Sequence, residues 1–130
     1  MYLYGSYDIS GRTSYCSWEY HVFSSADLIH WVDHGESFRS RGSDSDVSWT
    51  EAPLFAPDCI FYQGRYHLFF CNADRSEGVA DSLSPTGRFT NAAPIEGADG
   101  DAIDPAVLVD DDGQVYYYWG QFHLRGAKLR

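Results

Sequence analysis

Short apolar runs, rich in aromatic side chains, alternate with polar stretches along the whole chain. The runs lie at residues 2–4, 20–23, 59–62, 66–70 and 115–119. Runs of this length and composition are typical of β-strands. Turn sequences that contain glycine separate several of them: Gln63-Gly64, 84–87 and 110–113. The pattern therefore predicts an all-β fold.

Helical periodicity is almost absent from the chain. Residues 25–31, SADLIHW, are the one stretch for which we expect a single turn of helix. Residues 37–48, SFRSRGSDSDVS, are mostly polar and predict a long loop.

The two halves of the chain contain a repeat. Residues 56–70 align with residues 104–119, so that Pro57 meets Pro105, 48 residues further on. Both copies read as a strand, a tight turn and a second strand, and a third strand is expected at 78–82 and at 126–130.

The beginning of the chain matches the middle of this repeat. Leu3 corresponds to Leu68 and Tyr117, residues 20–25 correspond to 78–82, and residues 31–35 supply a fourth strand. A repeat of about 50 residues with about four strands is typical of a β-propeller blade. The sequence thus predicts a β-propeller fragment of about two and a half four-stranded blades, which begins and ends within a blade.

Composition narrows the classes of partner. The chain has 130 residues and a formal net charge of −10, with a pI near 4.6. Phosphate groups would be repelled, so neither nucleic acid nor an anionic membrane is expected as a partner. Neutral ligands such as sugars are compatible with this negative net charge. The first residues lack the features of a signal peptide, and the cellular compartment stays undetermined.

The cysteines indicate neither a disulfide framework nor a zinc site. The chain contains Cys16, Cys59 and Cys71, an odd number without zinc-like spacing. Cys59 and Cys71 lie in strand-like runs, where they are expected to act as small buried apolar side chains.

Asp104 is the main candidate for a functional site. It directly precedes Pro105 and an apolar strand at 106–109, and its partner in the repeat is Ala56. The first strand of each blade lines the propeller axis, so the starts of these strands converge on one mouth. The alternative is a turn carboxylate that caps its own backbone.

Four stretches of the chain resemble glycoside hydrolase family 43: residues 20–35, 55–70, 78–89 and 103–120. They occur in the order and at the spacing seen in that family. The resemblance implies a five-bladed propeller and the release of arabinose or xylose units from plant polysaccharides. Residues 2–8 and 15–20 look most like the β-xylosidases or α-L-arabinofuranosidases within it.

The resemblance also implies a catalytic role for Asp104. Members of the family are inverting enzymes with three carboxylates: a general base, a general acid, and an aspartate that raises the pKa of the acid. Asp104, in its Ile-Asp-Pro setting, matches the third. The base is expected before Met1 and the acid after Arg130. Residues 1–130 are then a partial catalytic domain, truncated at both ends and expected to be inactive alone.

The remaining acidic residues match neither missing motif. Those considered are Asp8, Glu51, Asp58, Glu77 and Asp101.

Two aromatic residues are candidates for contact with a sugar. Phe55 stands where the family usually has a tryptophan, and it could stack on a sugar face or belong to the core. Trp49 lies in the approach to the same strand, where a structural role is the stronger alternative.

No cofactor is expected for this chain. Residues 110–113, DDDG, lack the alternating spacing of a calcium loop and predict a hairpin turn. The resemblance allows a channel metal such as calcium in a complete propeller, near a histidine that this chain does not include.

Three functions remain open. The leading one is an inverting glycosidase that acts on arabinose- and xylose-containing carbohydrate. The second is a non-catalytic carbohydrate-binding propeller remnant. The third, a protein-interaction propeller, is disfavoured because such a protein does not need a carboxylate at the mouth.

Overall fold

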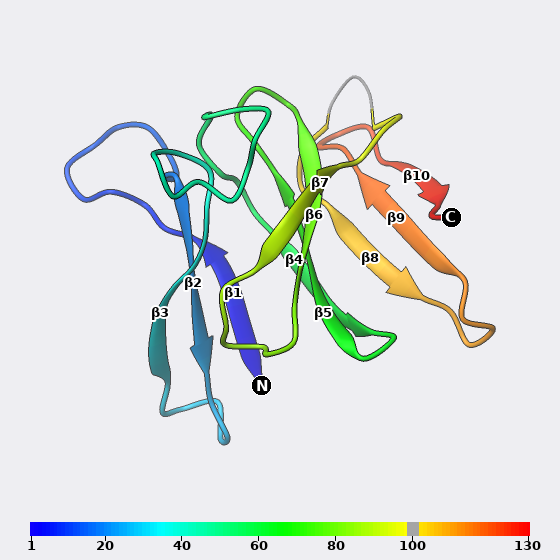
Figure 1. Cartoon of the computed structure of the whole chain (residues 1–130), viewed down its shortest axis with the longest axis horizontal. Coiled ribbons are helices and arrows are strands. Elements are labelled where there is room, and N and C mark those ends of the chain that lie inside the picture. The colour runs from blue at the N-terminus through cyan, green and yellow to red at the C-terminus, as the bar shows by residue number, and fades with distance from the viewer. Residues whose placement is uncertain (99–101) are drawn as a thin grey trace.

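The computed structural model describes residues 1–98 and 102–130, which form ten strands in three antiparallel sheets (Figure 1). Asp101 lies outside the described residues. Blade 1 contains β1 (Tyr2–Ser6), β2 (Glu19–Ser24) and β3 (Val32–Arg39). Blade 2 contains β4 (Asp58–Tyr62), β5 (Arg65–Cys71), β6 (Glu77–Ser82) and β7 (Thr90–Pro94). Blade 3 contains β8 (Ala106–Val109), β9 (Val115–Trp119) and β10 (Arg125–Lys128). No helix occurs in the described part of the chain, as predicted.

Strand pairing confirms the repeat. Asp58 pairs with Phe69 across β4 and β5, and Ala106 pairs with Tyr118 across β8 and β9. The first residues of these pairs are 48 positions apart and the second 49, as the alignment with one extra turn residue requires. The hairpins that open blades 2 and 3 therefore share one register.

Both faces of blade 2 are covered, because the three sheets stand side by side with blade 2 in the middle (Figure 1). Four consecutive residues of β5, Leu68–Cys71, are buried. Leu68 and Phe70 belong to the core shared with blade 1, whereas Phe69 belongs to the core shared with blade 3. A strand buried on both faces needs a continuous apolar run, and this explains why the runs in the sequence do not alternate.

In the outer blades, too, a strand residue is buried where its side chain faces a neighbouring blade. Tyr117 is buried against blade 2, as Leu68 is against blade 1. Leu3 takes the corresponding position in β1, but it is 53% exposed. It faces away from blade 2, since its neighbour Tyr4 packs on the core between blades 1 and 2. In this chain no sheet covers that face of blade 1.

Two local predictions were wrong. Residues 25–31 form bends and no helical turn. The Asp27 carboxylate accepts hydrogen bonds from the backbone N–H groups of Ile29 and His30, and it thereby folds the loop without a helix. The loop expected at residues 37–48 starts later, because β3 continues to Arg39 and buries Phe38 in the core.

Candidate functional site at the start of the inner strands

Asp104 lies at the entrance to β8, the inner strand of blade 3. Its side chain is exposed, and the following Pro105 is buried. Its φ is +54°, in the left-handed region that aspartate tolerates better than most residues. The Gly120 N–H at the end of β9 donates to the Ile103 carbonyl at 2.8 Å. A hydrogen bond thus fixes the backbone directly before Asp104, which is itself exposed.

Cys71 joins the entrances of two inner strands. Its thiol donates to the Ala56 carbonyl at a sulfur–oxygen distance of 3.7 Å. The backbone N–H of Asp104 points to the same sulfur, while burial raises the pKa of the thiol to about 12 and keeps the S–H in place. The repeat partners Ala56 and Asp104 therefore lie at the same end of the fold, around one buried side chain.

A second link joins the inner strands β4 and β8 at Val107, three residues after Asp104. The Asp58 carboxylate accepts a hydrogen bond from the Val107 backbone N–H at 2.7 Å. Its other oxygen accepts from the N–H of Cys59 at 2.8 Å. Asp58 thereby holds β8 against β4.

Phe55 and Trp49 lie in different surroundings. Phe55 is half-buried next to Cys71, whose carbonyl accepts its N–H at 2.9 Å, so it belongs to the same end as Asp104. Trp49 stacks on Phe70 with ring centroids 6.0 Å apart and packs against the core. Contact of either ring with a sugar stays a prediction.

The sequence did not single out Glu77 as a special group. Glu77 is 3% exposed, and its carboxyl accepts a hydrogen bond from the Tyr117 hydroxyl at 2.7 Å across the interface between blades 2 and 3. Its other oxygen has no partner within the described residues. Burial raises its pKa to about 7, although the bond from Tyr117 opposes this shift. One feature of the sequence could have indicated its burial: Glu77 begins a strand that pairs with the strongly apolar run at 66–70.

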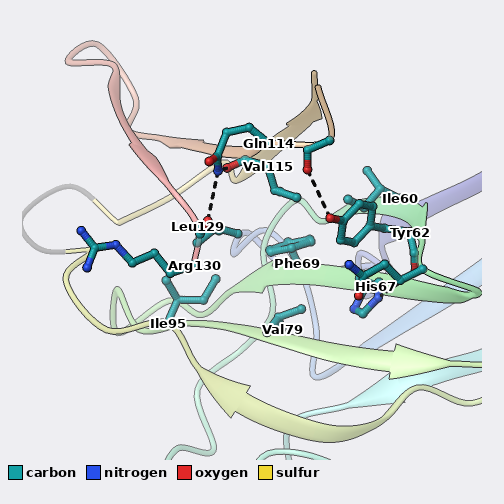
Figure 2. Close-up of a pocket in the computed structure, with 12 residues that line it drawn as sticks. Ile60, Tyr62, His67, Phe69, Val79, Ile95, Gln114, Val115, Leu129 and Arg130 are labelled. Atoms are coloured by element: carbon teal, nitrogen blue, oxygen red, sulfur yellow. Dashed lines mark hydrogen bonds between the residues drawn. The ribbon is translucent and has the colours of Figure 1, made fainter. Parts of the chain in front are cut away.

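A sizeable cavity lies away from Asp104. It has a volume of about 510 Å³ and opens between blades 2 and 3 (Figure 2). Its walls include the two turns that follow the inner strands, and there the Tyr62 hydroxyl donates to the Gly113 carbonyl at 3.2 Å. Since β8 starts beside Asp104 and runs toward that turn, the cavity and the aspartate occupy opposite ends of the blades. A functional role of Asp104 stays a prediction.

The described residues provide no obvious metal centre. Within residues 1–98 and 102–130, no three histidine, cysteine or acidic side chains gather as a metal would require. Residues 110–113 form the hairpin turn that was predicted: the Gly113 N–H donates to the Asp110 carbonyl at 2.8 Å, and Gly113 has a φ of +81°.

Comparison with known proteins identifies the family. The sequence model of glycosyl hydrolases family 43 matches residues 2–129. The chain belongs to family 43. It is 36% identical to Xylosidase/arabinosidase 43A of Humicola insolens, in an alignment of length 145 that covers all of this chain and 42% of that protein. It is 34% identical to a Xylosidase/arabinosidase of Bacteroides ovatus, covering 86% of this chain and 34% of the relative.

Solved structures of family 43 share the fold. The GH43_1 enzyme of Xanthomonas citri superposes with a TM-score of 0.74 at 34% identity, covering 94% of this chain and 37% of that one. A compost metagenome β-xylosidase/α-arabinofuranosidase, solved in complex with xylotriose, gives a TM-score of 0.74 at 35% identity, with 92% and 38% covered. The chain thus spans less than half the length of these relatives and forms part of a propeller of this family.

The described part of the chain contains no helix that is long and apolar enough to cross a membrane.

Proposed function

We propose that this chain is part of an inverting glycosidase that removes arabinose or xylose units from plant polysaccharides or oligosaccharides. The observation that carries the proposal is the placement of Asp104: an exposed carboxylate on a fixed backbone, at the end of the blades where the inner strands begin. Membership of family 43 and the names of its relatives support this class of substrate.

Asp104 has an electrostatic role in this proposal. A carboxylate close to a glutamic acid disfavours ionisation of that acid, so the acid keeps its proton near neutral pH and can donate it to the leaving oxygen. An inverting enzyme also needs its acid and base about 6.5–9.5 Å apart, which leaves room for a water molecule. We propose that the acid and the base are carried outside these 130 residues, and that the chain alone does not hydrolyse glycosides.

A chimera tests this function. The chain would replace the matching 42% of Xylosidase/arabinosidase 43A, which supplies the remaining blades. We expect the chimera to hydrolyse an aryl arabinofuranoside or aryl xyloside and to release the sugar with inverted anomeric configuration, as followed by NMR. The isolated chain and the relative without this segment should both be inactive.

Two outcomes would contradict the proposal. A folded chimera that binds xylotriose but does not hydrolyse either substrate would favour the carbohydrate-binding remnant. Release of the sugar with retained configuration would contradict the inverting mechanism.

A further inference from the structure

We propose that this chain binds a second copy of itself head-to-tail, so that blade 3 of one copy packs against blade 1 of the other. The contact uses the two faces that turn away from blade 2 (Figure 1). The blade 3 face is defined by Ala106, Leu108, Tyr116, Tyr118 and Lys128. The blade 1 face is defined by Leu3, Gly5, Tyr7, His21, Phe23 and Asp33. The proposal does not depend on the catalytic function proposed above.

The blade 3 face is aromatic and aliphatic, with one positive charge. Tyr117 packs in the core between blades 2 and 3, so its neighbours Tyr116 and Tyr118 point to the opposite side of the sheet. Leu108 pairs with Tyr116 and is 51% exposed. Lys128 pairs with Tyr116 from the other side, and its ammonium group lies 5.6 Å from the centroid of that ring.

The blade 1 face is also largely apolar, but its charge is negative. Leu3 pairs with Phe23 of β2, and Phe23 pairs with Asp33 of β3. The ring of His21 lies 6.4 Å from that of Phe23 between centroids, and Tyr7 stacks on His21 at 4.5 Å. The half-exposed carboxylate of Asp33 lies 3.5 Å from the Nδ1 atom of His21.

The internal repeat indicates how the two faces fit together. Tyr118 corresponds to Phe69, and Leu3 corresponds to Tyr117. Phe69 and Tyr117 contact each other across the interface between blades 2 and 3, with ring centroids 5.6 Å apart. Blade 3 of one copy can therefore meet blade 1 of a second copy through the same positions that join blades 2 and 3 within one chain.

The sizes of the side chains on the two faces are complementary. Gly5, two residues after Leu3, corresponds to Trp119, which helps to fill the interface between blades 2 and 3. Within the described residues, no atom beyond the chain neighbours lies within 4 Å of a Cβ atom built at Gly5. The blade 1 face thus has room where the blade 3 face carries the bulky Tyr116 and Tyr118.

Charge favours contact between unlike faces over contact between like faces. Lys128 and Asp33 attract each other across a head-to-tail contact, whereas two blade 1 faces would bring two Asp33 carboxylates together. The net charge of −10 opposes association of any kind, and salt screens this repulsion. Burial of apolar surface therefore has to supply most of the binding free energy.

The test is sedimentation velocity of the 130-residue chain over a series of concentrations, in about 0.15 M salt. We expect the wild type to associate beyond its monomer mass of 14.7 kDa. Leu3→Glu and Leu108→Glu should each raise the dissociation constant at least about tenfold, because a carboxylate would be buried in the contact. Leu83→Glu is the control and should associate like the wild type, since Leu83 is 74% exposed in a loop of blade 2 that belongs to neither face.

An equimolar mixture of Leu3→Glu and Leu108→Glu tests the head-to-tail arrangement. Each variant keeps one face intact and lacks a matching face on its own copies, whereas the mixture contains both intact faces. We therefore expect a heterodimer in the mixture and monomers of each variant alone. Both altered residues are exposed, so near-UV circular dichroism should show the wild-type fold in each variant.

Three results would each overturn the proposal. The first is a wild-type chain that stays monomeric at its highest soluble concentration. The second is association of either single variant as strongly as the wild type, which would indicate contact between like faces or through another surface. The third is a mixture of the two variants that stays monomeric.

Discussion

At the scale of single residues, the buried Glu77 should make folding depend on pH. Its carboxyl lies between blades 2 and 3, and burial raises its pKa from 4.5 to about 7. Below pH 4.5 the group is protonated in both the folded and the unfolded chain and has no effect. Between these two values only the unfolded chain ionises, so stability falls as the pH rises. The loss amounts to about 3 kcal/mol across the window.

Glu77→Gln removes this loss while its amide oxygen can still accept the Tyr117 hydroxyl. We predict that the variant gains about 3 kcal/mol relative to the wild type between pH 4.5 and pH 8, as measured by urea denaturation at a series of pH values. Glu96→Gln, a change in an exposed loop, is the matched control and should show no such gain. A constant difference between Glu77→Gln and the wild type at all pH values would contradict the assignment.

The sequence singles out Asp104 as a candidate, but it does not single out the environments of Glu77 and Cys71. Asp104 stands out because it breaks an otherwise apolar repeat at the position where the inner strand starts. Cys71 and Glu77 acquire their environments only when blades 2 and 3 pack together, so no local pattern reports them.

At the scale of elements, the Asp58 carboxylate is one of the links between the inner strands β4 and β8. We predict that Asp58→Ala destabilises the chain by about 1–3 kcal/mol, because the Val107 N–H loses its charged acceptor. Hydrogen exchange at the Val107 amide should become faster than in the wild type.

Asp111→Ala in the exposed turn after β8 is the control for removal of an aspartate, and it should leave both stability and exchange unchanged. Equal exchange at Val107 in Asp58→Ala and the wild type would show that the link between the inner strands does not depend on this carboxylate.

Strand positions and register were predictable because strongly apolar runs and glycine turns fix them. The extent of β3 was not, since Phe38 lies among polar residues that resemble a loop. Burial of Phe38 against Phe70 of the next blade outweighs the polar neighbours, and this contact is not local in sequence.

At the scale of the whole molecule, the three blades form part of a family 43 propeller. Leu3 of blade 1 and Leu108 of blade 3 are exposed apolar side chains on the faces turned away from blade 2. In the middle blade, β5 is covered on both faces. The exposure of Leu3 and Leu108 follows from their place in the outer sheets of the three.

The measurement that tests the central claim most directly is the pH–rate profile of Asp104→Asn in the chimera with Xylosidase/arabinosidase 43A. The side chain is nearly isosteric, so the fold should be kept. Without the negative charge the general acid ionises more easily, and its pKa falls. The account predicts a lower turnover and an alkaline limb that moves to lower pH. Full turnover with an unmoved alkaline limb would contradict it and leave Asp104 as a turn residue.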